Sequence, residues 1–323
     1  MLIALFVAAL ILAFAGGWRR IARDWRPRMG GFVMMLSVGL GIFFIIQLHH
    51  AVGSTIAASR NFYGTLRVYE EMPDREYGRN TKLVHGVITH GLQFWNPVQS
   101  RWPTTYYGET SGVGLAIKHL SRPEGSRRIG LVGLGTGTLA AYGRKGDHLR
   151  IYEINPAVEA IARKHFTFLA ESEAGVDVIL GDARLSMERE LAADSPQNFD
   201  LLALDAFSSD SIPIHLLTRE AMETYLRHLA RDGIIAVHIS NRYLDLQPVV
   251  EKLADTFHLA SVTINDESED SWWIFRTKWT LLARDPALLA DSELQDKASP
   301  RSSKTDTMPA WTDDHASLIH ALR

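Results

Sequence analysis

Along residues 128–284, short apolar runs alternate with amphipathic segments in a regular β/α order. The apolar runs have the length of strands and are uninterrupted, as expected of strands buried on both faces. One of the helical segments begins with Pro156, which the first turn of a helix tolerates. We therefore predict an α/β fold with a parallel sheet covered by helices on both faces. Strands are expected at 128–134, 149–154, 176–182, 199–205 and 233–240, with late strands at 260–266 and 278–284.

The segments around this core differ from it in pattern. Residues 51–104 alternate between polar and apolar positions with turn residues between them, which predicts a small β-rich unit ahead of a catalytic domain at 105–285. Residues 286–308 are poor in large apolar groups and are predicted to be a linker. Residues 309–323 contain Trp311 and a short helical pattern, so we expect this segment to dock back on the domain.

The first fifty residues contain two uncharged stretches, 2–18 and 30–50, on either side of an arginine-rich segment. A bilayer span needs about 20 apolar residues, so residues 1–50 are predicted to form one or two membrane helices. A cleavable signal peptide and a buried hairpin in a soluble protein are the alternatives. Arginines next to a span favour the cytoplasmic side, which would send the remaining chain across the membrane.

The composition narrows the classes of protein. A formal net charge of −3 over 323 residues indicates no global basic surface for nucleic acid. The chain has no cysteine, which removes disulfides, thiolate metal sites and cysteine nucleophiles. His85 and His90 are isolated and lack the spacing of metal ligands, so we expect structural histidines and no metal.

A glycine-rich turn indicates a nucleotide site. Gly133, Gly135 and Gly137 follow a predicted strand and open a helix, where they allow a tight turn and close approach of a ligand. Their G-x-G-x-G spacing differs from the dinucleotide fingerprint, and no Walker lysine follows. Glu153 ends the next strand and is placed to accept the hydroxyls of a ribose.

The third predicted strand ends in Gly181, Asp182 and Ala183, where Asp182 is placed to accept a hydrogen bond from an adenine amino group. These positions share the carboxyl edge of the sheet, which is where open α/β sheets bind ligands. The combined pattern predicts an adenosine site and looks like a class I S-adenosylmethionine-dependent transferase.

The stretch DLLALDAFSSDSIPIHLLT (200–218) places Asp205 at the end of a buried strand and Asp210 just before a helix. Each carboxylate has two interpretations. They could cap the helix, as such residues commonly do. They could also handle a cation and a proton.

The chain resembles the spermidine synthase (polyamine aminopropyltransferase) family, and within it the membrane-fused spermidine synthase-like proteins. The resemblance covers about residues 60–320. It rests on the motifs RNFYGTLRVYE, LVHGVITHGLQF, TTYYGETSGVGLA, GLGTGTL, IYEINP, GDAR, DAFSSDSIPIHLLTREA and WTDDHASL. It implies a small N-terminal β unit and a Rossmann-like domain. It also implies transfer of an aminopropyl group from decarboxylated S-adenosylmethionine to putrescine, with release of methylthioadenosine.

The resemblance also implies roles for single residues. Asp205 occupies the position of the catalytic base. Tyr106, Tyr107 and Glu109 lie where the family contacts its substrate, although packing between the two units is the alternative. Asp210 is expected either to hold the amine or to cap the helix.

Three departures from the family concern the amine half of the site. Thr136 stands where the family has an aspartate that grips the donor's amine, His85 where it has an acid, and Thr89 where it has a glutamine. The leading hypothesis is an aminopropyltransferase acting on putrescine or a related amine. A methyltransferase acting on a small nucleophile is the first alternative, and a non-catalytic membrane sensor of an adenosyl ligand or polyamine is the second.

The expected co-substrate is S-adenosylmethionine or its decarboxylated form. The expected partners are a small amine and the membrane, with a homodimer left open. Adenosyl sulfonium donors are made in the cytosol, so we expect a protein of the inner membrane whose catalytic domain faces the cytoplasm.

Overall fold

The computed structural model describes residues 35–43, 55–72, 77–120, 126–206, 213–267 and 271–323. The chain divides into two units, Met1–Thr55 and Ile56–Arg323. Residues 35–43 form a helix, whereas most of the predicted membrane region lies outside the described residues. In the described ranges, no helix is both long enough and apolar enough to cross a bilayer.

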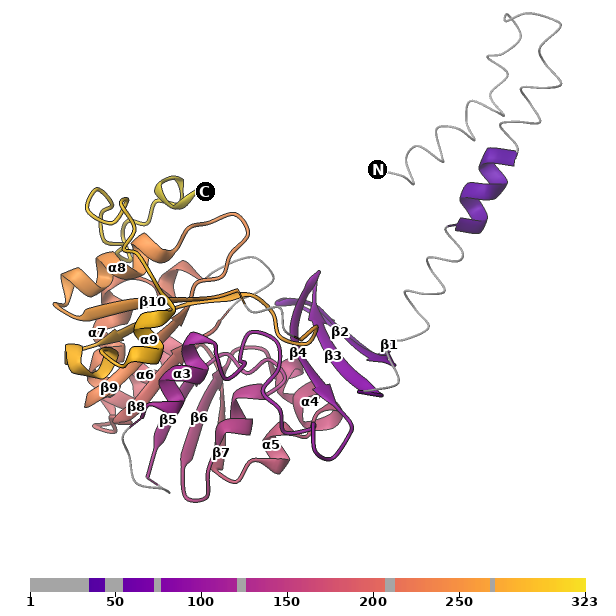
Figure 1. Cartoon of the computed structure of the whole chain (residues 1–323), viewed down its shortest axis with the longest axis horizontal. Helices are drawn as coiled ribbons and strands as arrows, with labels where there is room; N and C mark the ends of the chain where they lie inside the picture. Colours follow the sequence, from indigo (N-terminus) through magenta and orange to yellow (C-terminus); the bar gives the residue numbers. More distant parts are fainter. Residues whose placement is uncertain (1–34, 44–54, 73–76, 121–125, 207–212, 268–270) are drawn as a thin grey trace, which may run out of the picture. The chain divides into compact units, whose positions relative to one another are not determined.

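The second unit is built on an eight-stranded sheet with the order β12-β10-β11-β9-β8-β5-β6-β7 (Figure 1). The five strands from β9 to β7 pair with one another in parallel, as predicted. On the other side of β9, the strands β11, β10 and β12 continue the sheet with antiparallel pairing. This is a Rossmann-like α/β fold. The strands are β5 (Arg128–Val132), β6 (His148–Glu153), β7 (Gly175–Leu180), β8 (Phe199–Leu204), β9 (Leu229–His238), β10 (Ala260–Asp266), β11 (Thr277–Ala283) and β12 (Ala298–Ser299).

The sheet is buried on both faces. Along β8, Leu201 and Ala203 pack into one apolar cluster, while Leu202 and Leu204 pack into another. Successive side chains of a strand point to opposite faces, so an uninterrupted apolar run fills two cores at once. The helices are α3 (Gly112–Lys118), η2 (Thr138–Tyr142), α4 (Pro156–His165), α5 (Phe168–Glu171), α6 (Ala183–Ala192), η3 (Ile214–Leu216), α7 (Arg219–His228), α8 (Gln247–Thr256), η4 (Pro286–Leu289), α9 (Ser292–Asp296) and η5 (Ile319–Ala321).

The segment 212–230, which reads as one helix in the sequence, is divided after η3. The Thr218 side chain accepts a hydrogen bond from the Ala221 N–H, so Thr218 caps a new helix, α7. A threonine in extended conformation satisfies an otherwise unpaired donor of the first turn. The capping preference of Thr218 therefore divides a continuous amphipathic pattern.

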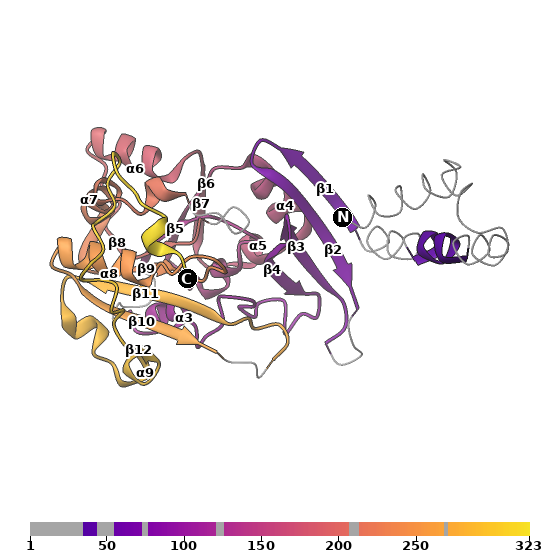
Figure 2. The same ribbon diagram turned by 90° about the horizontal axis from the view of Figure 1, so that it is seen from above.

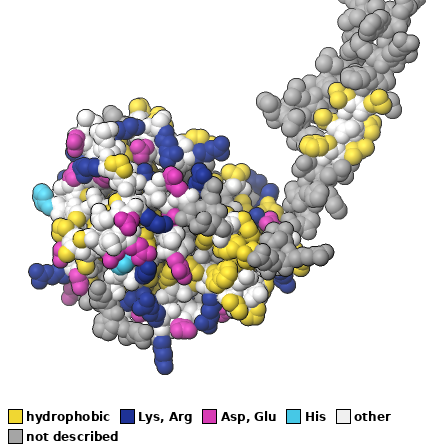
Figure 3. All heavy atoms as spheres, viewed as in Figure 1, with side chains coloured by type: hydrophobic (Ala, Val, Ile, Leu, Met, Phe, Trp, Pro, Cys, Tyr) yellow, Lys and Arg dark blue, Asp and Glu magenta, His cyan; other side chains and the backbone are white. Residues whose placement is uncertain are grey.

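A four-stranded sheet, ordered β1-β2-β3-β4, stands beside the larger sheet (Figures 1 and 2). Asn61 donates to Asn155 at 2.6 Å, and Gln93 donates to Thr167 at 2.7 Å, which ties this sheet to the α4 region. Figure 3 shows apolar side chains gathered over the same sheet. Its strands are β1 (Thr55–Asn61), β2 (Gly64–Glu71), β3 (Asn80–His85) and β4 (Ile88–Phe94).

Residues 286–308, expected to be a linker, instead hold η4, α9 and β12. Leu289 and Leu294 are buried, and β12 pairs with β10 at the edge of the sheet. Two well-placed leucines and an open sheet edge therefore order a segment of low average hydropathy. Beyond it, Trp311 is buried and its carbonyl accepts from the Arg219 N–H at 2.8 Å.

Candidate active site

Asp205 follows β8 at the carboxyl edge of the large sheet. Its N–H donates to the Val132 carbonyl at 2.9 Å, which continues the β5–β8 pairing by one residue. Its carboxylate Oδ2 accepts from the Tyr107 hydroxyl at 2.5 Å, and Oδ1 contacts His238 Nδ1 at 2.6 Å. Two donors from different elements therefore fix the carboxylate in one orientation.

His238, which the sequence reasoning missed, also lies at this site. It ends β9, the parallel neighbour of β8, and Leu204 is paired with Val237 in that ladder. The next residues, Asp205 and His238, are therefore side by side. A lone polar residue at the end of a buried strand, on the sheet edge that holds Asp205, was the signal that could have identified it.

Contacts at both ring nitrogens and a stacked aromatic ring fix the orientation of the His238 imidazole. Its Nε2 lies 2.9 Å from the Ser240 hydroxyl and 3.1 Å from the Thr277 hydroxyl, and its ring stacks on Trp279 at 4.6 Å. An ionised carboxylate only accepts hydrogen bonds, which places a proton on Nδ1 facing Asp205. The ring is therefore a fixed donor toward the carboxylate.

Tyr107 and Tyr106 both lie at this site, as predicted. Burial and the neighbouring Asp205 raise the pKa of Tyr107 well above its ordinary value, so its hydroxyl remains a donor. The Tyr106 ring lies 5.5 Å from that of His238 and 5.3 Å from that of Phe275. The pair forms an aromatic wall next to the carboxylate.

A cavity of 200 Å³ lies on the glycine-turn side of Asp205. Most of the predicted cofactor residues line it, and Gly137 is not among them. Gly137 precedes η2, and a Cβ there would lie 3.0 Å from Leu169. Gly137 therefore serves packing of the turn. The predicted residues that do line the cavity are Gly133, Gly135, Glu153, Asp182 and Ala183.

Gly133 and Gly135 have φ angles of 99° and 55°, which favour glycine. A Cβ at Gly133 would lie 2.4 Å from the Asp205 carbonyl oxygen, and one at Gly135 would lie 2.9 Å from the His90 carbonyl oxygen. Because these glycines have no Cβ, the turn can lie against the backbone carbonyls of Asp205 and His90 beside the cavity. Its own backbone is also accessible to a ligand there.

Glu153 is buried and accepts the N–H of Leu134 at 2.9 Å and that of Asn155 at 2.8 Å. Burial raises its pKa, and these backbone hydrogen bonds oppose that effect. Asp182 accepts from the Leu185 N–H and lies 2.9 Å from His215 Nε2. Each carboxylate thus shapes its own loop while facing the cavity, and retains lone pairs for ribose or adenine groups.

A second cavity of 310 Å³ lies on the other side of Asp205. Asp205 and His90 line both cavities, and Tyr106, Tyr107 and His238 line the second. Burial lowers the pKa of His90 to about 4, so this ring is neutral near pH 7. Asp205 therefore lies at the junction of two spaces, each with room for a small molecule.

Other predicted residues lie elsewhere. Glu109 is exposed and lines a separate cavity with Lys118 and Arg127. Asp210 lies outside the described residues. Thr136 is buried, bonds the Thr138 hydroxyl at 2.8 Å and lines neither cavity beside Asp205. The structure thus brings together the tyrosines and Asp205 but not Glu109.

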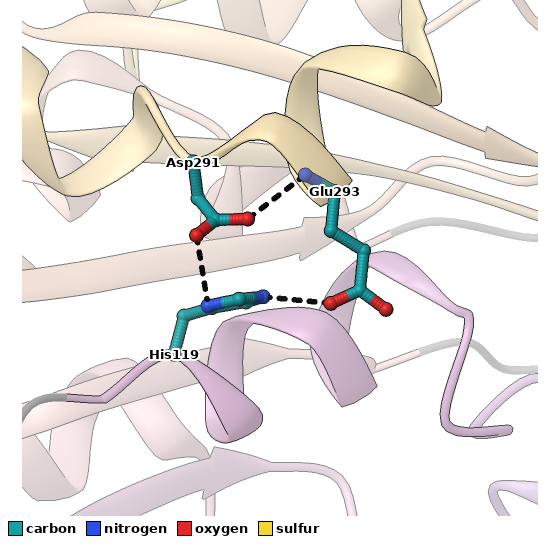
Figure 4. Close-up of side chains that lie close together, drawn as sticks. All are labelled: His119, Asp291 and Glu293. Atoms are coloured by element: carbon teal, nitrogen blue, oxygen red, sulfur yellow. Dashed lines mark hydrogen bonds and ion pairs between the residues drawn. The ribbon is translucent and has the colours of Figure 1, made fainter.

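A cluster of His119, Asp291 and Glu293 links α3 to α9 (Figure 4). Its geometry could admit a cation. However, the Lys118 ammonium contacts both oxygens of Glu293 at 2.7 and 2.9 Å and lowers the pKa of that carboxyl. The Lys118 ammonium already neutralises the Glu293 carboxylate. The cluster therefore forms ion pairs that connect α3 to α9.

The chain is similar to known proteins in sequence and in fold. It is 33% identical over 186 residues to a polyamine aminopropyltransferase from Vibrio vulnificus, a match covering 57% of this chain and 58% of that protein. The chain therefore matches just over half the length of this curated relative. No family model matches the chain.

Two solved structures share the fold. A spermidine synthase from Thermotoga maritima has a TM-score of 0.51 and 12% identity, with 84% of each chain covered. A spermidine synthase in complex with the transition-state analogue AdoDATO has a TM-score of 0.50 and 13% identity, with 83% of each chain covered.

The fold is an α/β Rossmann-like fold, with two cavities that meet at Asp205. The sequence match and the shared fold support the spermidine synthase-like family, which is a family of transferases. They do not show the membrane-fused branch.

Proposed function

We propose that the protein transfers an aminopropyl group from decarboxylated S-adenosylmethionine to an amine and releases methylthioadenosine. The observation that carries this proposal is the position of Asp205 between two cavities, with its carboxylate oriented by Tyr107 and His238. The cavity with the glycine turn would hold the adenosine, and the cavity with the tyrosines would hold the acceptor.

The residues of the first cavity suit an adenosyl group. Glu153 offers carboxylate oxygens to the ribose hydroxyls, and Asp182 offers one to the adenine amino group. Val132 and Leu134 supply an apolar lining beside the glycine turn. The residues present therefore fit a nucleoside, and the sulfonium carbon would lie toward Asp205.

Asp205 supplies the base that the reaction needs. A primary ammonium has a pKa of about 10, so near neutral pH its nitrogen must give up a proton before it has a lone pair for attack. The amine nitrogen forms a bond to the carbon attached to sulfur, the carbon–sulfur bond breaks, and its electron pair remains on the sulfur. The nitrogen's proton passes to Asp205, directly or through water.

The hydrogen bonds of Asp205 leave it able to do this. A carboxylate has about four acceptor positions, and Tyr107 and His238 occupy two of them. The remaining lone pairs can hold the ammonium. Fixing the carboxylate beforehand removes the cost of orienting it during the reaction, which is a major source of rate enhancement.

Methyl transfer is the second candidate, and Thr136 favours it. The family's aspartate at this position grips the amine of a donor that lacks a carboxylate. Thr136 has no charge and bonds Thr138. A donor with a carboxylate beside its amine does not depend on an acid there, so S-adenosylmethionine itself becomes an acceptable donor.

Product analysis tests the proposal. Purified protein is incubated with each form of the donor and a panel of amines, and the released nucleoside is identified by mass spectrometry. Methylthioadenosine with a product heavier by one aminopropyl group supports the proposal, whereas adenosylhomocysteine supports methyl transfer. Donor binding without either product across the panel contradicts both and favours a sensor.

We also propose that residues 1–50 attach the protein to a membrane and that the catalytic domain faces the cytosol, where the donor is made. The support is the pair of uncharged stretches in the sequence. Fractionation of cells expressing the full chain tests this, since recovery without membranes contradicts it.

A further inference from the structure

The second cavity beside Asp205, which we propose to hold the acceptor and call the acceptor cavity, is lined by more cationic than anionic side chains. Four cationic residues, Arg242, Arg276, Lys278 and Arg323, line it, and Asp205 is the carboxylate among its described lining residues. A diamine such as putrescine carries a positive charge at each end near neutral pH. It would therefore place at least one ammonium among arginine and lysine side chains, which like-charge repulsion opposes.

Two of these residues are arranged by the sheet. Arg276 directly precedes β11 and Lys278 is its second residue, so the two are two positions apart, and alternate residues of an extended chain point to the same side. The Lys278 ammonium donates to Gln247 Oε1 at 2.7 Å, which holds it in place without neutralising its charge.

Arg242 follows β9 on the same side of the cavity, and its guanidinium lies 5.8 Å from the Tyr243 ring. Within the described part of the chain, neither Arg242 nor Lys278 forms an ion pair with an acid. Their charges are therefore available to a ligand.

The described acids near this cavity are engaged elsewhere. Asp266 accepts from Thr110 and pairs with Lys297 at 3.1 Å, and neither Asp266 nor Glu267 lines the cavity. The acids Asp210, Glu269 and Asp270 lie outside the described residues. Among the described side chains that line the cavity, Asp205 is therefore the one carboxylate, beside four cationic residues.

We infer that the acceptor is an amine that also carries a carboxylate or another anionic group. This inference rests on the proposed function. The amine faces Asp205 and the aromatic wall, and the anionic group is held by Arg242 and Lys278. Arginine suits this task because its planar guanidinium binds a carboxylate through two parallel hydrogen bonds. The transfer step is unchanged, with the amine nitrogen as nucleophile and Asp205 as proton acceptor.

Matched pairs of compounds test the inference by calorimetry on the full chain, with methylthioadenosine filling the donor cavity. We compare 4-aminobutanoate with putrescine, and 5-aminopentanoate with cadaverine, because each pair has the same chain length. We expect the amino acids to bind at least about tenfold more tightly than the diamines. Equal or tighter binding of the diamines would overturn the inference.

Two substitutions identify the residues responsible. Arg242→Gln and Lys278→Gln should weaken binding of the amino acids at least about fivefold and leave the diamines unchanged or improved. Arg231→Gln and Lys145→Gln are controls, because both side chains are exposed and outside the cavity. Arg242 is also exposed, so its replacement should leave the fold intact. Unchanged amino-acid binding in both variants contradicts the inference.

A carboxylate on the donor is the other source of negative charge. Binding of S-adenosylmethionine and of its decarboxylated form is therefore compared in the Arg242→Gln protein. If only S-adenosylmethionine binding weakens, the cationic group serves the donor and the acceptor assignment is wrong. Absence of transfer to any amine would refute the proposed function, whereas the binding preference still decides the inference.

Discussion

The imidazole of His238 and the carboxylate of Asp205 meet at 2.6 Å, although 33 positions separate them along the chain. The parallel pairing of Leu204 with Val237 places the two residues next to each other at the end of adjacent strands. We therefore expect His238 to act as a positioning residue, through the carboxylate of the proposed base.

Replacing His238 with Phe should lower kcat while leaving the fold intact. Phenylalanine keeps a ring over Trp279 but loses the hydrogen bond to Asp205. A hydrogen bond to a charged group is worth about 1.5–3 kcal/mol, which corresponds to roughly a 10- to 100-fold loss of rate. Steady-state kinetics measure the effect, with unchanged donor affinity as the sign of an intact first cavity.

The pH–rate profile separates positioning from general stability. His238→Phe removes a donor that stabilises the charged carboxylate, so the acidic limb should move to higher pH. His238→Gln, which keeps a donor in this place, should restore part of kcat. A profile identical to that of the unmodified protein would show that His238 has only a structural role.

Replacing Asp205 with Asn should abolish most of the turnover. The amide preserves the shape of the side chain but is far too weak a base, and loss of a general base costs typically about 10²–10⁴ in rate. Binding of methylthioadenosine, followed by calorimetry, should change little, because Glu153 and Asp182 remain. Turnover at the original rate would remove Asp205 from the mechanism.

The buried His90 should make stability depend on pH. Its pKa is lowered from 6.5 to about 4 in the folded protein. As the pH falls through 6.5, the unfolded chain takes up a proton that the folded chain excludes, so stability decreases until about pH 4 and this contribution then levels off. The gap corresponds to roughly 3 kcal/mol.

Urea unfolding at pH 7.5 and pH 5.0 measures this effect, and His90→Gln provides the comparison. Glutamine does not titrate, so the variant should lose less stability between the two values. If both proteins lose the same amount, another group is responsible for the dependence.

Replacing Gly133 with Ala should damage both stability and donor binding. Its φ angle is 99°, and a Cβ would lie 2.4 Å from the Asp205 carbonyl oxygen. Such a substitution destabilises by more than about 1 kcal/mol. Gly175→Ala is the matched control, because its nearest atom is 3.8 Å from the added Cβ. Equal unfolding midpoints for the two variants would contradict this account of the turn.

Much of the fold could be predicted from the sequence. The β/α order follows from apolar runs such as that of β8, where every residue is buried. The break at Thr218 and the ordering of residues 286–308 were not predicted. The break depends on one helix cap, and the ordering depends on the free edge of the sheet at β10. Hydropathy averaged over a stretch of sequence detects neither feature.

The candidate site was predicted unevenly. Gly133, Glu153 and Asp205 were predicted to lie together because each ends or follows a strand, and the carboxyl edge of a parallel sheet collects such residues; all three line one cavity. Glu109 was placed with Tyr107 because of the family resemblance, but it lines a different cavity. Arg242 and Lys278 were not considered, because a surface arginine and a strand lysine have no distinctive sequence pattern.

The sequence by itself determined the β/α order of the core and the residues at the carboxyl ends of its central strands, because periodicity acts over a few neighbouring residues. Only the tertiary structure decided that His238 contacts Asp205 and that four cationic residues line one cavity. Those relationships depend on strand register and on which loops meet at one sheet edge, and both are set by packing between segments far apart in the chain.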